Sequence, residues 1–150
     1  MRFIKLLMAA CIMLSASQIL AQGQKIEKAK ELFEKLVILS DSFDSAVADL
    51  YSSEAVIRNT RHYAFGQTRV MTMPAQDYKN MIRSTMPIAK LRGDISTFSD
   101  VRYYEEGDKI RIRATRYSKL KNYSFPYSLL VGEDENGNWL IYEENLETKP

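Results

Sequence analysis

The stretch from Ile95 to Leu146 constrains the fold most, because four successive runs in it alternate apolar and polar residues as strands do. Turn residues separate the runs, with Glu106-Gly107 inside the first pair and Asn136-Gly137 inside the last. Both Asn and Gly tolerate the positive φ angles of a two-residue type I′ turn, so we expect a tight hairpin there. The pattern predicts four antiparallel strands in a row, with the upstream residues covering one face of the sheet.

The first 21 residues are typical of a secretory signal peptide. Arg2 and Lys5 give a positive start, and the apolar run Leu6–Leu14 that follows is too short to cross a bilayer. Small and polar residues then lead to a cleavage site after Ala21. Two alternatives stay open: an uncleaved anchor, or a lipoprotein signal that ends at Cys11.

Cleavage would leave one domain, residues 22–150, that is periplasmic or secreted and meets the membrane only transiently through its signal peptide. Cys11 is the only cysteine, so this domain has no disulfide and no thiol nucleophile. His62 is the only histidine, and no tight acidic cluster lies near it in the sequence. We therefore expect no metal site and no cofactor.

The charge of the chain is segregated, although its net value is only +2 and falls to zero without Arg2 and Lys5. Residues 22–57 carry −3, residues 58–121 carry +8 and residues 122–150 carry −5. We expect these blocks to neutralise one another within the fold. A nucleic-acid-binding protein would keep a net basic surface, so the sequence argues against nucleic acid as a partner.

Upstream of the four strands, the pattern predicts three helices and a short hairpin. An amphipathic stripe runs through the first helix, and proline is expected to begin the last helix and to end it. The expected elements are a helix at 22–39, a helix at 43–50, strands at 55–59 and 68–72, and a helix that starts at Thr72 or Met73 and ends at Pro87.

Two phrases carry a resemblance to a known family. Residues 49–57 read DLYSSEAVI, similar to a helix-end phrase LYADDAVV, and residues 137–141 read GNWLI, similar to a last-hairpin phrase dGkWrIv. In this order and spacing, the chain resembles the NTF2-like superfamily over about residues 24–147. That superfamily includes ketosteroid isomerases and SnoaL-like cyclases.

The resemblance implies an α+β cone, with three N-terminal helices packed on a curved, mostly antiparallel sheet of about six strands. We expect an exported binding module for a small apolar or amphipathic ligand, or for a partner protein in the cell envelope. A non-catalytic role is favoured because only His62 accompanies Glu144 as a second acid–base candidate. The alternatives are a small pocket enzyme of isomerase, cyclase or dehydratase type, and a secretion-complex scaffold. The histidine often found after the last-strand phrase is replaced here by Glu143-Glu144.

Strand alternation predicts that Glu144 points towards the helices, next to Leu129 and on the side of Tyr127 and Tyr142. The same alternation brings Arg116 to that side, where it could partner the carboxylate. We hypothesise that Glu144 and Arg116, with tyrosine hydroxyls, form a polar rim or floor to an otherwise apolar pocket. If the pocket is catalytic, Glu144 is the best candidate base. The alternative is that both residues lie beyond the core edge in water.

Further pocket candidates are Tyr51 and Tyr103, because tyrosines can line the cavity of a cone-shaped fold. His62, with Arg58 nearby, is either a general base or a solvated loop histidine kept neutral by surrounding cations. A pairing of residue 105 with 108 sets Tyr103 opposite Ile110 and places a row of cations outside the sheet. This row, which is solvated or binds anionic lipid or polysaccharide, comprises Arg102, Arg111 and Arg113.

A two-residue turn at 136–137 sets Trp139 opposite Asp134 and Ile141 opposite Gly132. Leu130, Trp139 and Ile141 then share the outer face of the sheet, where they would leave an exposed apolar strip. We therefore expect a homodimer that pairs through this face. A three-residue loop would swap the faces and move Trp139 into the core.

Overall fold

The computed structural model describes residues 2–149, with side chains from Ala21 onward. Met1, Pro150 and most side chains of the expected signal peptide therefore lie outside the described residues. The elements in chain order are α1 (Arg2–Asp41), η1 (Ser45–Leu50), β1 (Tyr51–His62), η2 (Ala64–Gly66), β2 (Thr68–Pro74), α2 (Ala75–Arg92), β3 (Ser96–Glu106), β4 (Lys109–Ser118), β5 (Tyr123–Glu133) and β6 (Trp139–Thr148).

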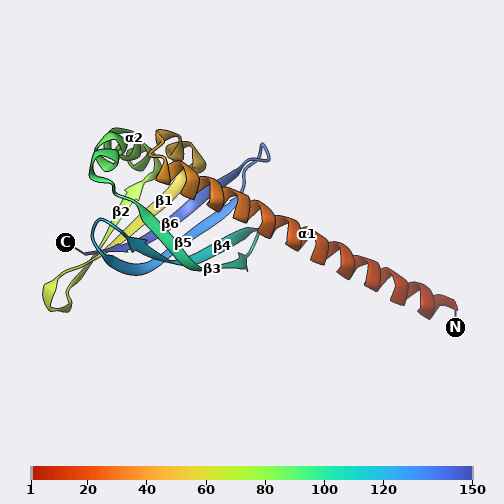
Figure 1. The fold of residues 1–150 in the computed structure, drawn as a ribbon. Helices are drawn as coiled ribbons and strands as arrows, with labels where there is room; N and C mark the ends of the chain where they lie inside the picture. The colour runs from red at the N-terminus through yellow and green to blue at the C-terminus, as the bar shows by residue number, and fades with distance from the viewer. Residues whose placement is uncertain (1, 150) are drawn as a thin grey trace.

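The six strands form one curved sheet in the order β2-β1-β6-β5-β4-β3, with α1, η1 and α2 on one face (Figure 1). All neighbours are antiparallel except β1 and β6, which run parallel. The expected α+β architecture and sheet are confirmed. Among the described residues, no helix is both long and apolar enough to cross a membrane.

The expectation of three N-terminal helices is wrong in detail. The second helix is only the short 3₁₀ turn η1, whose start is capped by Asp44 through a 2.8 Å bond from the Ala46 N–H. The third, α2, begins after Pro74 and continues through Pro87 to Arg92. Gly93 ends α2 at φ 61, where its N–H reaches the carbonyls of Ala89 and Lys90 in the last turn.

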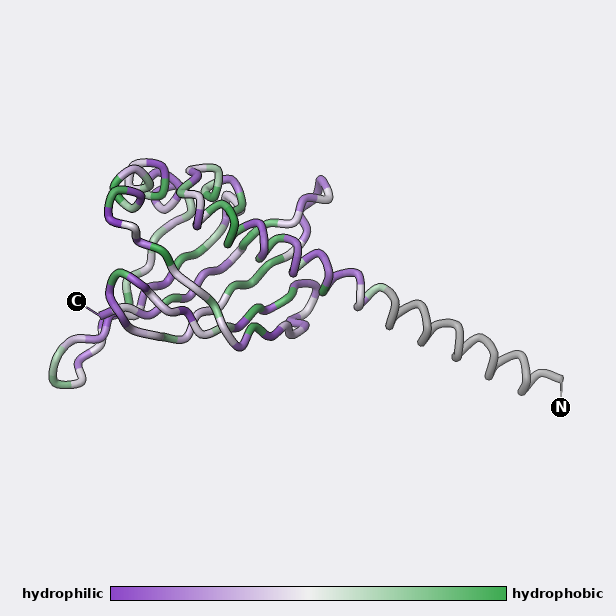
Figure 2. The backbone as a smooth tube through the Cα atoms, viewed as in Figure 1, coloured by the Kyte–Doolittle hydropathy of each residue, from purple (hydrophilic) through white to green (hydrophobic). Residues whose placement is uncertain are grey.

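The core lies between α1 and the inner face of the sheet. One stripe of α1 supplies Ala29, Leu32, Phe33 and Leu36, all buried. Opposite them, five sheet residues are fully buried: Ile110, Ile112, Leu129, Val131 and Ile141. Figure 2 shows the same hydrophobic segments along the central strands and the part of α1 that crosses them. Burying an apolar side chain of this size stabilises the fold by about 1.5–3 kcal/mol.

The β3–β4 hairpin turns at Gly107-Asp108, with Glu106 opposite Lys109 and Tyr103 opposite Ile112. The expected register, with Tyr103 opposite Ile110, is therefore wrong by two residues. Because side chains alternate with a period of two, a shift of two keeps every residue on its expected face. The outer face accordingly carries Arg102, Arg111 and Arg113, as expected.

The β5–β6 hairpin differs from the expected two-residue turn, since residues 134–138 all lie in the loop. The Asp134 carboxylate holds this loop by accepting the backbone N–H groups of Asn136 (2.9 Å) and Asn138 (2.8 Å). Trp139 consequently opposes Glu133 and Ile141 opposes Val131. A bulge at Tyr142 then shifts the register by one residue.

This register corrects the expected outer strip. Ile141 is fully buried on the core side, and Trp139 is partly buried against the core on the same face. Of the three residues expected on the outer face, only Leu130 lies there, opposite Glu143. Dimerisation through the outer face stays a prediction.

Candidate functional site

Glu144 is buried in the middle of the sheet, opposite Leu129 of β5 and beside Ile57 of β1. The residue is only 5% exposed. Tyr51 donates a 2.7 Å hydrogen bond to one carboxylate oxygen, and Tyr127 donates a 2.8 Å bond to the other. The predicted inward direction of Glu144 is confirmed, and its partners are tyrosine hydroxyls.

Tyr78 of α2 completes this cluster, since its ring meets that of Tyr51 edge-on with centroids 5.2 Å apart. Burial, and then the nearby charge of Glu144, raise the pKa of the Tyr51, Tyr78 and Tyr127 hydroxyls well above their usual value. The three hydroxyls therefore stay protonated near neutral pH. Tyr51 and Tyr127 each donate to one oxygen of Glu144, and burial of the residue keeps this carboxylate away from the surface.

Arg116 does not pair with Glu144, so the hypothesis of an ion pair is wrong. Its guanidinium Nε donates instead to the Ser96 hydroxyl at 2.9 Å, on the neighbouring edge strand β3. Arg116 lies opposite Phe125 of β5, whereas Glu144 lies opposite Leu129. The alternation correctly places Arg116 on the inner side, but the two residues sit at different heights along the strands.

The other pocket candidates lie apart from Glu144. Arg58 is 3.6 Å from Glu143 on the outer face, and Tyr142 packs under the Lys109 ammonium, 4.8 Å from its ring centroid. Tyr103 is partly buried, and burial with the charges of Glu34 and Glu27 raises its pKa. Only Tyr51 and Tyr127 among the predicted candidates therefore join Glu144.

His62 belongs to the end of β1 instead of a loop. Its Nε2 atom lies 2.6 Å from a carboxylate oxygen of Glu147, and its ring stacks on Phe125 with centroids 5.0 Å apart. The two contacts hold the imidazole against β6 and β5. Among the described residues, no cluster of three or more potential ligands could hold a metal ion.

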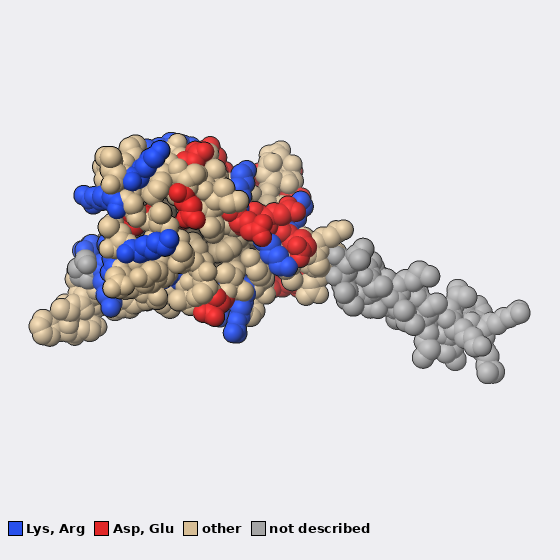
Figure 3. Space-filling model, viewed as in Figure 1, with Lys and Arg blue, Asp and Glu red and all other residues tan. Residues whose placement is uncertain are grey.

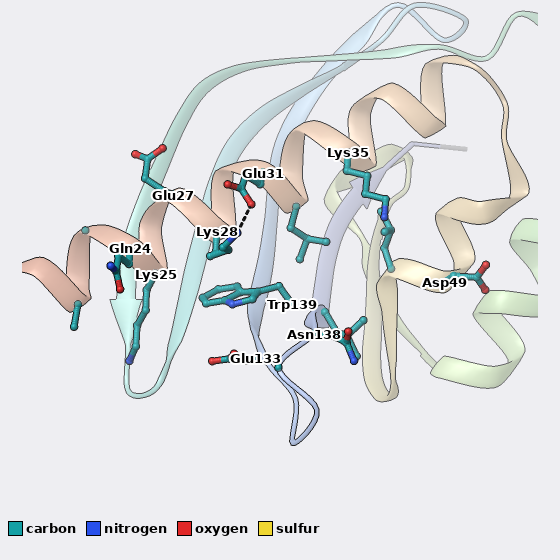
Figure 4. Close-up of a pocket in the computed structure, with 16 residues that line it drawn as sticks. Gln24, Lys25, Glu27, Lys28, Glu31, Lys35, Asp49, Glu133, Asn138 and Trp139 are labelled. Carbon is teal, nitrogen blue, oxygen red and sulfur yellow. Dashed lines mark hydrogen bonds and ion pairs between the residues drawn. The ribbon is translucent and has the colours of Figure 1, made fainter.

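An open groove of about 1480 Å³ lies between α1 and the β5–β6 hairpin (Figure 4). Its apolar part includes Leu32, Leu50 and Trp139, and Glu144 does not line it. The α1 wall is polar and charged, with Gln24, Lys25, Glu27, Lys28, Glu31 and Lys35 along its length. In Figure 4 the Trp139 ring lies under α1 beside Lys28, whose ammonium is 2.8 Å from Glu31.

Sequence reasoning missed this groove and Tyr78. The assignment of Trp139 to the outer face depended on the turn length, and no motif in the sequence links Tyr78 to Glu144. A second, smaller hollow of about 460 Å³ lies between α1 and β3, and it is lined by Phe33, Glu34, Val37, Ile38, Asp41, Ser96, Thr97, Phe98 and Val101.

No family model and no curated protein matches the sequence. Solved structures do match the fold. An NTF2-like protein of unknown function from Pseudomonas putida KT2440 superposes with a TM-score of 0.62 at 11% identity, over 83% of this chain and 85% of that one. An NTF2-like protein with a cystatin-like fold from Novosphingobium aromaticivorans gives 0.58 at 14% identity, over 86% and 84%.

The fold is NTF2-like. A putative ketosteroid isomerase from Shewanella frigidimarina also superposes, with a TM-score of 0.56 at 15% identity over 79% of this chain and 93% of that one. At such identities the likeness establishes the NTF2-like fold alone, and the chemistry of the site depends on this chain's own residues.

Proposed function

We propose that this NTF2-like protein is a non-catalytic binding module that takes an elongated amphipathic ligand in the groove beneath α1. The observation that carries the proposal is Trp139, whose ring lies in the open groove. Tryptophan combines a large apolar surface with a polar N–H and is enriched among residues that dominate binding energy.

The two walls of the groove match such a ligand. Trp139, with the small exposed parts of Leu32 and Leu50, offers an apolar surface for a hydrocarbon chain or an apolar side. Lysines and glutamates alternate along the α1 wall, where they can meet a polar or charged head group. The groove runs beside residues 21–35 of α1, and so at about 1.5 Å per residue it is about 20 Å long.

The geometry of the two acid–base candidates supports a non-catalytic role. Glu144 is enclosed by tyrosines and lines neither hollow, and His62 is held by Glu147 and Phe125. A general base must come within hydrogen-bond reach of the proton that it removes. Trp139 and the charged wall of α1 can bind a ligand without such a group.

Export through a signal peptide cleaved after Ala21 is part of the proposal, with residues 22–150 as the mature domain in the periplasm or outside the cell. The basic start and short apolar run of the sequence support it. N-terminal sequencing of the exported protein should find Gln22 first. An intact Met1 form as the main membrane-bound species would contradict it.

Binding can be measured through Trp139, which is the only tryptophan. Titration with dodecanoate below its micellar concentration should give a saturable change in Trp139 emission. By calorimetry, Trp139→Ala should weaken binding by about 10-fold or more, since residues of this kind contribute about 1–2 kcal/mol or more. The matched control Ile38→Ser alters the second hollow and should bind normally. Absence of saturable binding, or a loss in Ile38→Ser only, would contradict the groove as the site.

A further inference from the structure

Three chain reversals each expose an apolar side chain next to cations. The β1–β2 hairpin carries Phe65 between Arg61 and Arg69, and the Phe65 side chain is fully exposed. The last turn of α2 reads Lys90-Leu91-Arg92, with Leu91 88% exposed. The β4–β5 turn reads Lys119-Leu120-Lys121, with Leu120 45% exposed. Segments far apart in the sequence thus repeat one pattern.

Strand pairing brings these reversals to one end of the sheet. The end of β1 pairs with the end of β6 at Arg61 and Thr148. The backbone N–H of Lys149 reaches the hydroxyl of Tyr123, where β5 begins (3.3 Å). The backbone N–H of Lys119 donates to the carbonyl of Ile95, which follows α2 (3.0 Å). Figure 1 shows the β1–β2 hairpin, the end of α2 and the β4–β5 turn on the side where the C-terminus lies.

We call these segments, residues 61–69, 90–95 and 119–122, the basic end. Their charged side chains are Arg61, Arg69, Lys90, Arg92, Lys119 and Lys121 against the single acid Asp94. The hairpins at the opposite end of the sheet, residues 105–109 and 133–138, reverse this balance. They carry Glu105, Glu106, Asp108, Glu133, Asp134 and Glu135 against the single cation Lys109. Figure 3 shows basic side chains over α2 and beside it, and acidic ones further along α1.

Phe65 is the most exposed of the three apolar side chains, and its backbone holds it out. The residue has φ 65 and ψ 22, a left-handed conformation that bulky side chains seldom adopt. Gly66 follows at φ 78, so the tip of the hairpin is built from two consecutive left-handed residues. With its ring entirely in water, Phe65 gains nothing from the core of its own chain and is available to enter another apolar medium.

We propose that the basic end docks on a membrane surface that contains anionic lipid. Phe65, Leu91 and Leu120 would enter the boundary between head groups and acyl chains, as apolar side chains of interfacial proteins do. The flanking lysines and arginines would reach the lipid phosphates with their charged heads while their stems lie along the apolar layer. A soluble polyanion would satisfy the cations but would leave the three apolar side chains in water.

This inference does not depend on the proposed function. The groove beneath α1 includes Glu133 and Asn138 of the acidic end, so it lies away from a membrane that touches the basic end. A failure of dodecanoate binding and a failure of vesicle binding are therefore separate results.

Flotation of the chain without residues 1–21 with vesicles tests the proposal. Vesicles of three parts phosphatidylcholine to one part phosphatidylglycerol should carry the protein, and pure phosphatidylcholine vesicles should not. Replacing Lys90, Lys119 and Lys121 by Gln should weaken binding about 100-fold, since each cation near an anionic surface contributes a factor of about five. The matched control replaces Arg83, Arg102 and Arg113 by Gln, which removes the same charge elsewhere and should reduce binding far less.

Two further variants distinguish lipid from a soluble polyanion. Replacing Phe65, Leu91 and Leu120 by Ser keeps the charge and should reduce vesicle binding about 10-fold, since burial of apolar area is part of interfacial binding. In Phe65→Trp, vesicles with brominated acyl chains should quench the added emission, whereas wild-type Trp139 should be unaffected. Unchanged binding of the Ser variant with equal binding to dextran sulfate would overturn the proposal, as would absence of quenching.

Discussion

Glu143 and Glu144 are adjacent in β6, yet the structure holds their carboxylates in different ways. Glu144 points into the core and accepts hydrogen bonds from two neutral tyrosines. Glu143 points outward, where Arg111 lies at 3.1 Å and Arg58 at 3.6 Å. The Glu144 carboxylate accepts from neutral hydroxyl groups, whereas the Glu143 carboxylate lies beside two guanidinium groups.

The difference follows from what each face can accommodate. A tyrosine brings a large apolar ring into the core together with one hydroxyl donor, so Tyr51 and Tyr127 fill space and satisfy the carboxylate at once. An arginine beside Glu144 would add a second charge to be desolvated. On the outer face Arg111 extends over the sheet, where it also pairs with Glu106 at 2.7 Å. Removing the inner carboxylate should therefore lower the free energy of unfolding far more than removing the outer one.

The largest expected effect is that of Glu144→Ala. It leaves the hydroxyls of Tyr51 and Tyr127 unpaired and creates a cavity, so the free energy of unfolding should fall by about 3–5 kcal/mol. Urea denaturation measures this, with Glu143→Ala as the matched control at about 1 kcal/mol or less. Equal losses in the two variants would remove the distinction between the faces.

Tyr127→Phe should come next. It removes one hydrogen bond to a charged acceptor while keeping the ring, at a cost of about 1.5–3 kcal/mol. Combining Tyr51→Phe and Tyr127→Phe with Glu144→Leu removes every polar member of these two bonds. This triple variant should recover much of the stability, because apolar replacement of a buried polar set is often nearly neutral. A triple variant less stable than Glu144→Ala would contradict this view of the cluster.

Alkaline pH should reveal the same cluster. The pKa values of Tyr51, Tyr78 and Tyr127 are raised in the folded state, so their contribution to stability is complete below the unfolded pKa of about 10. Above that value the unfolded chain releases these protons first and stability falls, by about 1.4 kcal/mol per pH unit for each tyrosine. Denaturation between pH 9 and 11 should show a shallower fall in Tyr127→Phe. An unchanged slope would argue against a raised pKa.

The smallest effect is expected on the outer face. Glu143→Gln should lower stability by less than about 1 kcal/mol, and 1 M NaCl should abolish the difference because partly exposed ion pairs are screened. The corresponding Glu144→Gln loss should persist in salt, since the buried carboxylate is shielded from ions. Urea midpoints with and without salt compare the two variants directly.

Alternation in the sequence was sufficient to predict the four C-terminal strands and the inward direction of Glu144. It placed Trp139 and Ile141 on the wrong face of the sheet. The loop at 134–138 is longer than the two-residue turn, which moves the register by one, and the bulge at Tyr142 moves it back. Residues before the bulge therefore lie on the opposite face to the expected one, whereas Glu144, beyond it, lies opposite Leu129 as predicted.

Contacts between elements were less accessible from the sequence. Tyr78 reaches the cluster because α2 packs against β1 and η1, and helical spacing carries no information on that docking. The pairing of Glu144 with tyrosines rather than with Arg116 depends on relative height along neighbouring strands, which alternation leaves undetermined. The residue types therefore identified Glu144 and the tyrosines as residues of interest, but not which of them contact one another.

The parallel pairing of β1 with β6 has a consequence for how the chain becomes folded. These strands are neighbours in the sheet, and the Tyr51–Glu144 bond joins residues 93 positions apart. During synthesis, β1 and the β2 hairpin leave the ribosome long before the strand that connects them to the rest of the sheet. We expect the nascent chain to remain unfolded until β6 emerges, because contacts so distant in sequence form slowly and late. Such a delay is compatible with the export proposed above, because a translocation channel admits an unfolded chain.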